Sequence, residues 1–264
     1  MTKTILVTGG SGVWDVFLAW ALADAGHIVY VGENHSDPGF SPVNVVTDND
    51  TRVRTVPYES LDQYSITAAV QRVVAEAGTI DVLIHLTTPV TSGPAESFTP
   101  YQLGQVYDLA VLSAQRVLRA VLPAMRERQD GLLIWAGPGI EPRPESFSGP
   151  GRAVRAAQRQ LVESYAVELA PFGIDVTFLT YEPGNFEGHG TAAPLKPDDA
   201  TIAQAYGNPP AAPSWKSVGG RAATAARAME VADSVIGIVE ARKGARPVHL
   251  DLWKPAQSPP TDQE

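Results

Sequence analysis

The sequence predicts an α/β fold in which a doubly wound parallel sheet carries helices on both faces. Short apolar runs alternate with longer amphipathic segments along most of the 264 residues. Parallel strands need a crossover between them, and a helix usually supplies it, so this alternation indicates a parallel sheet. Since no internal repeat divides the chain, we expect a single domain over residues 1–253.

The predicted strands are short runs of apolar residues, many of them β-branched, which is typical of buried strands. In chain order they cover residues 5–8, 28–31, 53–56, 82–86, 132–135, 175–179 and 248–252. The predicted helices have apolar residues at helical spacing, and Gly26 and Gly78 are expected to end the first two. The first helix begins near Val13, and the others cover 66–77, 101–129, 153–169 and 231–241.

Two segments do not follow this alternation. Residues 185–217 are rich in proline and glycine, and we expect an irregular lid or insertion over the binding cleft, where such folds carry their specificity. Residues 254–264 have the sequence KPAQSPPTDQE. This polar and proline-rich composition is typical of a disordered tail.

The chain holds 20 Lys and Arg residues against 29 Asp and Glu, a formal net charge of −9 at pH 7. This balance disfavours binding to nucleic acid or to anionic membranes, because both need clustered positive charge. The absence of cysteine excludes disulfides, thiol nucleophiles and cysteine-ligated metals. No apolar run is long enough for an export signal or a membrane span, so we expect a cytoplasmic protein.

Five segments, in this order and spacing, resemble the short-chain dehydrogenase/reductase superfamily. They are TILVTGGSG, LADAGHIVYVG, GTIDVLIH, VLPAMRERQDGLLI and ELAPFGIDVTFLTYEPG, and the resemblance runs from Thr4 to about Asn185. It implies a Rossmann-like sheet that binds NAD(P) at its carboxyl edge. It also implies carbonyl reduction or alcohol oxidation by a set of asparagine, serine, tyrosine and lysine residues.

The phosphate-binding loop departs from the superfamily pattern T-G-x-x-x-G-x-G. An ungapped alignment from Thr8 puts the first glycine on Gly9 but the other two on Val13 and Asp15. A valine side chain then stands where backbone should approach the pyrophosphate, and a carboxylate would repel it. We therefore expect no NAD(P) cofactor, although Glu33 after the second strand would suit an NAD ribose.

The four catalytic positions implied by the resemblance also differ. The asparagine position falls on Ala110, the serine position on Pro138, the tyrosine position on Gly151 and the lysine position on Arg155. Alanine, proline and glycine have no side chain that donates or accepts a proton, so ordinary hydride-transfer catalysis is not expected. Arg155 resembles the arginine of the halohydrin dehalogenases, a cofactor-free branch of the superfamily. The alternative for Arg155 is a solvated or subunit-interface side chain.

Three residues are candidates for catalysis, namely His85, Arg155 and Glu182. An imidazole titrates near neutral pH and could act as a general acid or base, although His85 could also be a hydrogen-bonded core histidine. We expect a cleft at the carboxyl ends of the strands, lined by polar and aromatic residues. They are Trp14, Asp15, Thr87, Trp135, Glu141, Tyr181 and Asn185. The histidines and acids show no metal-ligand spacing.

These observations favour a small-molecule enzyme that works without NAD(P) and without redox chemistry. The reaction classes considered are lyase, isomerase, cyclase and halohydrin dehalogenase or epoxide-type chemistry. One alternative is a catalytically inactive pseudo-reductase subunit that pairs with an active partner, and a second is an NAD(P)-dependent reductase with an atypical site. Helices 101–129 and 153–169 are expected to form a homodimer or homotetramer, or a heteromer with a related chain.

Overall fold

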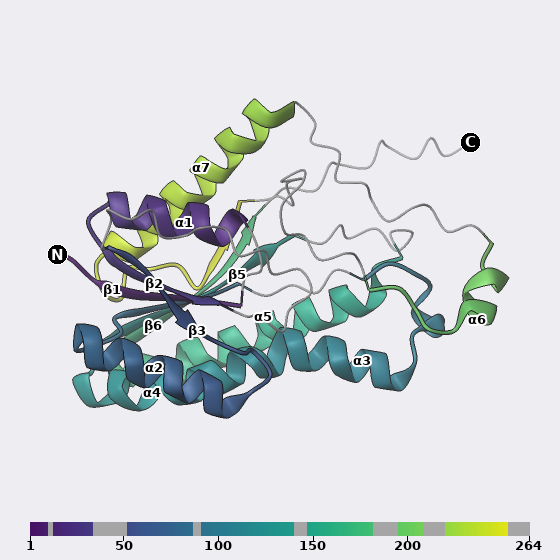
Figure 1. Ribbon diagram of the computed structural model, residues 1–264, viewed down its shortest axis with the longest axis horizontal. Helices are drawn as coiled ribbons and strands as arrows, with labels where there is room; N and C mark the ends of the chain where they lie inside the picture. Colours follow the sequence, from purple (N-terminus) through teal and green to yellow (C-terminus); the bar gives the residue numbers. More distant parts are fainter. Residues whose placement is uncertain are drawn as a thin grey trace.

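The computed structural model describes residues 1–9, 13–33, 52–86, 91–139, 147–181, 195–207 and 220–252. These residues form one parallel sheet of seven strands in the order β3-β2-β1-β4-β5-β6-β7 (Figure 1). The strands are β1 (Thr4–Thr8), β2 (Ile28–Glu33), β3 (Val53–Pro57), β4 (Val82–Leu86), β5 (Gly131–Pro138), β6 (Ile174–Tyr181) and β7 (His249–Asp251). The predicted fold class, a Rossmann-like doubly wound sheet, is confirmed.

The helices cover both faces of the sheet (Figure 1). They are α1 (Val13–Asp24), α2 (Gln63–Ala77), α3 (Pro100–Tyr107), α4 (Ser113–Arg128), α5 (Gly149–Leu169), α6 (Ala200–Ala205) and α7 (Gly220–Glu240), with short turns η1 (Ala95–Ser97), η2 (Asp108–Leu112) and η4 (Ala170–Phe172). Helices α1 and α7 share one apolar cluster with the sheet, and α2, α4 and α5 share the cluster on the opposite face.

The alternation of side chains along each strand divides the core between these two faces. In β1, Ile5 and Val7 pack on the side of α1 and α7, whereas Leu6 packs on the side of α2 and α4. All five residues of β1 are buried, as expected for a central strand covered on both sides. The continuous apolar runs of the sequence therefore reflect burial from both faces.

The expected long helix over residues 101–129 is observed as a continuous helical run from Pro100 to Arg128, and a π-helical turn, η2, lies within it between α3 and α4. Such a turn frees backbone carbonyls from the helical pattern. The Ser113 hydroxyl donates to the Leu109 carbonyl at 2.5 Å, and the Gln158 side-chain amide donates to the Ala110 carbonyl at 2.7 Å. Because these two side chains supply donors, the carbonyls released by the π-helical turn remain hydrogen-bonded. The periodicity of apolar residues alone does not reveal these hydrogen bonds.

The predicted helix ends near glycine are observed. Helix α2 ends at Ala77, and Gly78 follows in the left-handed conformation, with its N–H bonded to the Val74 carbonyl. Within the expected irregular segment, the short helix α6 begins after Asp199, whose carboxylate accepts from the Ile202 N–H at 2.9 Å. The rest of the expected lid, 185–194 and 208–217, and the expected tail, 254–264, lie outside the described residues.

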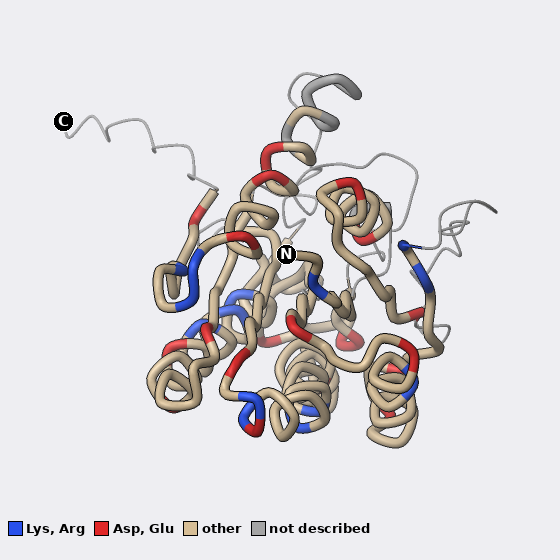
Figure 2. The backbone as a smooth tube through the Cα atoms, turned by 90° about the vertical axis from the view of Figure 1, so that its left-hand side faces the viewer, with Lys and Arg blue, Asp and Glu red and all other residues tan. Residues whose placement is uncertain are grey.

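The amino edge of the sheet, where the strands begin, carries oppositely charged side chains that lie in pairs. Figure 2, which views this edge, shows basic and acidic residues interspersed rather than separated. The Arg246 guanidinium lies 2.8 Å from the Asp175 carboxylate, and Lys243 lies 3.4 Å from Asp130. The net negative charge of the chain is therefore not gathered into one patch at this edge.

Among the described helices, none combines the length and apolarity needed to cross a bilayer.

Close packing at Gly32 of β2 gives a stability prediction. A Cβ atom added at Gly32 would lie 2.9 Å from the Cβ and Cγ atoms of Tyr58, which is fully buried. Because neither the strand nor the buried ring can move freely, Gly32→Ala is expected to lower the free energy of unfolding by about 1–3 kcal/mol. Urea denaturation of the purified variant measures this change.

Gly104→Ala is the matched control of opposite sign. Gly104 lies in α3, and an added Cβ would meet no atom within 4 Å. Alanine at an exposed helical position is expected to stabilise by about 0.5–1 kcal/mol. If Gly32→Ala left the urea midpoint unchanged while Gly104→Ala raised it, the packing at Tyr58 would be looser than the structure implies.

Candidate active site

The candidate site lies at the carboxyl edge of the sheet, where the strand order reverses. Strands β1 and β4 are neighbours there, although two strands and two helices separate them along the chain. Open α/β sheets bind their ligands in the crevice at such a switch point. The strand ends that border it are Thr8, Leu86, Pro138 and Tyr181.

The start of α1 borders this crevice. Gly9 follows β1 with a φ of +80°, and α1 begins four residues later at Val13. The unpaired N–H groups of a helix start carry partial positive charge and suit an anion. Asp15 lies in this first turn and is only 6% exposed, so one negative charge already stands near the place where a diphosphate would approach.

Glu33 is the last residue of β2, the strand between β1 and β3, and so lies on the β2 side of the switch point. Its backbone carbonyl accepts from the Tyr58 N–H at 2.9 Å, which holds the strand end in place. A partly exposed carboxylate at the end of this strand suits the hydroxyls of an adenosine ribose. Gly9, the α1 start and Glu33 therefore fit a nicotinamide dinucleotide, and Asp15 is the departure from that fit.

His85 is held by two hydroxyl groups in the interior of the fold. Its Nδ1 lies 2.9 Å from the Thr8 Oγ1, and its Nε2 lies 3.2 Å from the Ser113 Oγ. Because the Ser113 hydroxyl donates to the Leu109 carbonyl, its oxygen accepts from His85, and the ring carries its proton on Nε2. Nδ1 is then the acceptor of the Thr8 hydroxyl. A directional chain of hydrogen bonds thus links β1, β4 and η2.

Burial lowers the pKa of His85 to about 3, so the ring is neutral at physiological pH. The imidazole is 3% exposed and packs edge-on against Trp135, with ring centroids 6.1 Å apart. A buried neutral ring that uses both nitrogens for internal hydrogen bonds has no free position for a substrate. The structure therefore places His85 as a core histidine, the alternative that the sequence left open.

Arg155 is also buried, at 8% exposed, and is neither a solvated nor a surface arginine. Its Nη2 donates to the Gly137 carbonyl at 3.0 Å, to the Leu179 carbonyl at 2.9 Å and to the Thr180 hydroxyl at 3.2 Å. Burial lowers its pKa to about 10, which leaves the guanidinium charged at pH 7. Arg155 therefore ties α5 to the carboxyl ends of β5 and β6.

Two further contacts complete the surroundings of Arg155. Its Nη1 donates to the Gln158 side chain at 3.2 Å, and Gln158 in turn binds the Ala110 carbonyl of η2. The guanidinium carbon lies 3.9 Å from the centre of the Phe178 ring, within the range of a cation–π contact. The position implied for a catalytic lysine thus holds a structural cross-link.

The remaining three implied catalytic positions carry no proton donor. Gly151 and Ala110 are buried, and Pro138 ends β5. The Gly151 N–H donates to the Thr91 hydroxyl at 3.0 Å, so only its backbone is engaged. Trp135, expected to line the cleft, lies in the core beneath α2 and α4 and is 4% exposed.

Tyr181, like Asp15, is an expected pocket residue that the structure places at the carboxyl edge. It ends β6 and is partly exposed, with its ring against the apolar cluster on the α1 side. Thr87, Glu141, Glu182 and Asn185 lie outside the described residues, as does the side chain of Trp14. The roles predicted for these five residues remain predictions.

Sequence reasoning missed four polar residues of the site. They are Thr8, Ser113, Gln158 and Thr180, which supply the partners of His85 and Arg155. Thr8, Ser113 and Thr180 are polar residues in or at the end of apolar runs, and Gln158 has no such signal. A polar residue in an apolar run does not by itself identify its hydrogen-bond partner. The partners come from elements that meet only in the folded chain.

The sequence model described as "short chain dehydrogenase" matches residues 3–196. This match covers most of the chain and includes the strand ends, the α1 start and the Arg155 helix. The protein belongs to the short chain dehydrogenase family.

Curated relatives of this family member are named as oxidoreductases. The 3-ketodihydrosphingosine reductase of Bacteroides thetaiotaomicron is 28% identical over 188 residues, which cover 70% of this chain and 64% of the relative. The cyclopentanol dehydrogenase of Comamonas testosteroni is 25% identical over 178 residues, covering 66% of this chain and 70% of the relative. The match thus spans less than two thirds of the length of the first of these relatives.

Solved structures of short chain dehydrogenases share the fold. A short-chain dehydrogenase from Streptomyces avermitilis aligns with a TM-score of 0.71 and 22% identity, covering 96% of this chain and 89% of the other. A 3-ketoacyl-(acyl-carrier-protein) reductase from Brucella melitensis, complexed with NADH, aligns with a TM-score of 0.61 and 19% identity, covering 80% and 92%. At these identities the likeness supports the fold alone.

The expectation of a non-redox enzyme, or of an inactive subunit, is wrong. The relatives named as reductases and dehydrogenases contradict the cofactor-independent, lyase, halohydrin dehalogenase-like and pseudoenzyme interpretations. Those interpretations rested on a few substituted positions, whereas the similarity to oxidoreductases extends over some two thirds of the chain. The loss of a side chain at one position does not exclude a group from another strand.

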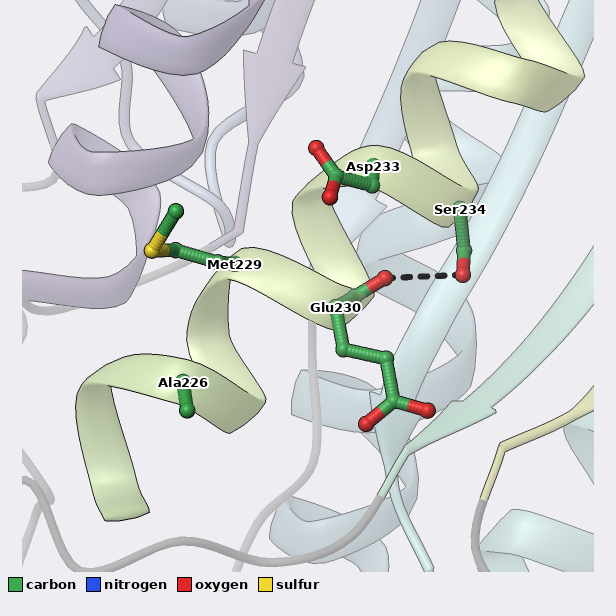
Figure 3. A pocket seen from close by; sticks show the side chains of 5 residues that line it. All are labelled: Ala226, Met229, Glu230, Asp233 and Ser234. Carbon is green, nitrogen blue, oxygen red and sulfur yellow. Dashed lines mark hydrogen bonds between the residues drawn. The ribbon is translucent and has the colours of Figure 1, made fainter. Parts of the chain in front are cut away.

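The described residues also form an open hollow of about 550 Å³ on α7. Ala226, Met229, Glu230, Asp233 and Ser234 line it, and all five belong to that helix (Figure 3). The Ser234 hydroxyl donates to the Glu230 backbone carbonyl of its own helix. A hollow with a single described wall does not point to a ligand, so the carboxyl edge remains the candidate site.

Proposed function

We propose that this short chain dehydrogenase family member is an NAD-dependent oxidoreductase that interconverts a ketone and a secondary alcohol. The observation that carries the proposal is Glu33 at the carboxyl end of β2, in a family whose curated relatives are oxidoreductases. A carboxylate there accepts hydrogen bonds from a ribose and repels the additional phosphate of NADP. The proposal is therefore specific to NAD.

Three features of the chain would hold the dinucleotide. Glu33 would bind the adenosine ribose, and Gly9 together with the start of α1 would receive the diphosphate. When bound, the cofactor supplies or accepts the hydride. Arg155 and the chain of hydrogen bonds through His85 hold the ends of β1, β4, β5 and β6 in fixed positions, which keeps the edge rigid around the reacting groups.

The substrate class follows from the relatives and remains part of the proposal. The names of the relatives include a 3-ketodihydrosphingosine reductase, a cyclopentanol dehydrogenase and a ketoacyl reductase. These substrates share a secondary alcohol or its ketone beside apolar carbon. A ketone of this kind, either cyclic or at the third carbon of a longer chain, is the proposed substrate.

A titration of the purified protein with NADH and with NADPH tests the proposal, with quenching of its five tryptophans as the signal. We expect NADH to bind in the micromolar range and NADPH at least about tenfold more weakly, since one unfavourable charge contact is worth about 1.4 kcal/mol or more. The Glu33→Gln variant should fold normally, and its dissociation constants for NADH and NADPH should differ less than those of the parent. Glu230→Gln on the outer surface of α7 is the matched control and should leave it unchanged.

The same titration can contradict the proposal. If neither dinucleotide bound at millimolar concentration while the protein was folded, NAD-dependent chemistry would be refuted. Tighter binding of NADPH than of NADH would refute the role of Glu33 but not that of the cofactor class.

A further inference from the structure

The site as described lacks an obvious proton donor for a ketone. Pro138 and Gly151 stand at the positions where the family resemblance implies a serine and a tyrosine. His85 is neutral, enclosed and committed through both ring nitrogens. A reduction that leaves an alcohol still needs an acid within hydrogen-bond reach of the carbonyl oxygen.

Tyr181 lies beside one of these substituted positions. Strands β5 and β6 pair in parallel with Pro138 opposite Tyr181, so the phenol-bearing residue is the direct neighbour of the implied serine position. The Gly139 N–H donates to the Tyr181 carbonyl at 2.7 Å, which holds the two strand ends together. Tyr181 is therefore fixed at the carboxyl edge by its backbone, on the strand next to the one that lost its donor.

The surroundings of Tyr181 combine a cation and an anion. Arg155 binds the Leu179 carbonyl and the Thr180 hydroxyl, the two residues that precede Tyr181. Burial and the Asp15 carboxylate raise the pKa of Tyr181, and the Arg155 guanidinium lowers it. The raising effects outweigh the lowering one, so the phenol is protonated at neutral pH, and the Arg155 guanidinium offsets only part of the cost of forming the phenolate.

We propose that Tyr181 is the acid that protonates the substrate oxygen, with Arg155 as the residue that positions its strand. This inference rests on the proposed function. As the C=O π bond breaks, the carbonyl carbon accepts hydride from the reduced nicotinamide dinucleotide, and the carbonyl oxygen accepts the phenolic proton of Tyr181. The products are the secondary alcohol, the oxidised dinucleotide and a phenolate, which then takes a proton from water.

The pair would replace the family's arrangement with groups from two elements. A tyrosine and a lysine one turn apart on one helix are implied by the resemblance, whereas here the cation stays on α5 and the phenol comes from β6.

Tyr181→Phe tests the proposal, because phenylalanine keeps the ring that packs against the α1 side and removes only the hydroxyl. The probes are NADH with cyclopentanone and with 9,10-phenanthrenequinone, an activated diketone. We expect the variant to bind NADH with a Kd within about twofold of the parent and to lose about 10²–10⁴-fold in turnover, the usual contribution of a general acid. Circular dichroism and the NADH titration serve as readouts that do not depend on turnover.

Tyr165→Phe is the matched control. Tyr165 is also partly buried, its hydroxyl bonds to the Gln115 side chain, and it lies ten residues beyond Arg155 on α5. That spacing puts it about 15 Å along the helix from Arg155. Turnover of this variant should stay within about threefold of the parent, which is less than a general acid contributes.

Each outcome separates the inference from the proposed function. If the parent protein binds no dinucleotide, both fail. If the parent binds NADH and reduces a probe while Tyr181→Phe remains as active, the inference fails and the proposed function stands. If the parent binds NADH but reduces not even the activated diketone, the inference also fails, because a donor in place should sustain that reaction.

A second experiment applies if Tyr181→Phe does not fold. The chain can be produced with its eight tyrosines replaced by 3-fluorotyrosine, whose phenol is a stronger acid but nearly the same size. The rise of cyclopentanol oxidation by NAD with increasing pH would then be displaced to lower pH than in the parent. A rise at unchanged pH would overturn a tyrosine as the proton-transferring group.

Discussion

Replacing Arg155 with alanine is expected to lower the free energy of unfolding by about 3–5 kcal/mol. The guanidinium is buried and donates to two backbone carbonyls and to two side chains from three different elements. Without it, the carbonyls of Gly137 and Leu179 lose a buried partner, at a cost of about 1–3 kcal/mol each. The loss of the long side chain over Phe178 also leaves a cavity, which adds to the cost.

Urea denaturation of Arg155→Ala and Arg155→Lys measures this contribution. Lysine keeps the charge but cannot reproduce the fork of donors, so we expect a smaller loss of about 1–3 kcal/mol for it. Arg159→Ala is the matched control. Arg159 lies one turn further along α5, is about half-exposed and pairs with Glu163 at 3.5 Å, so its loss should cost less than about 1 kcal/mol.

The result that would contradict this assignment is equal stability of Arg155→Ala and Arg159→Ala. In that case water would donate hydrogen bonds to the carbonyls at the ends of β5 and β6 in place of Arg155. The cross-link would then contribute position rather than stability.

The second large expected effect is a loss of folding stability at acidic pH. Below pH 6.5 the protein is expected to lose stability through His85, by up to about 5 kcal/mol at pH 3. The pKa of the folded-state ring is about 3, against an ordinary value of 6.5. As the pH falls, the unfolded chain takes up the proton first, so this contribution is complete above pH 6.5 and is lost progressively between pH 6.5 and 3. Each unit of difference is worth about 1.4 kcal/mol.

Urea denaturation at a series of pH values checks this, with His85→Gln as the variant. Glutamine does not titrate, so the variant should be less stable at pH 7, because its hydrogen bonds to Thr8 and Ser113 are imperfect, but its stability should fall less steeply below pH 6.5. His27→Gln is the comparison. Burial also lowers the pKa of His27, but Glu240 opposes this, so its removal should flatten the profile less.

A slope below pH 6.5 that stayed the same in His85→Gln would show that other groups govern acid unfolding. The chain of hydrogen bonds from Thr8 to η2 would then tolerate a charged ring. That result would contradict the assignment of His85 as a buried ring that stays neutral.

Much of the fold follows from local pattern. The seven strands appear within a few residues of the apolar runs that predict them, because a strand covered on both faces must be apolar at nearly every position. The ends of α1 and α2 follow from Gly26 and Gly78, which adopt the left-handed conformation that other residues avoid. The assignment of Ala110, Pro138, Gly151 and Arg155 to the implied catalytic positions follows from the family resemblance.

The chemistry at those positions does not follow from spacing. Sequence reasoning treated the loss of a tyrosine and a serine as the loss of redox function, and the named oxidoreductase relatives contradict it. The reason for this error lies in the geometry of proton transfer. A proton donor needs only to reach the substrate oxygen, and β6 runs beside β5 at the same edge, so a phenol can approach from a strand more than forty residues away in the chain.

The amino-acid sequence was sufficient for the doubly wound sheet, its family and the sheet edge that we propose as the site, because burial and turn conformation act over a few neighbouring residues. The partners of His85, the carbonyls bound by Arg155 and the π-helical turn appear only once the chain is folded. Each depends on hydrogen bonds between groups from distant segments, and those bonds exist only after packing has excluded water and brought the elements into contact.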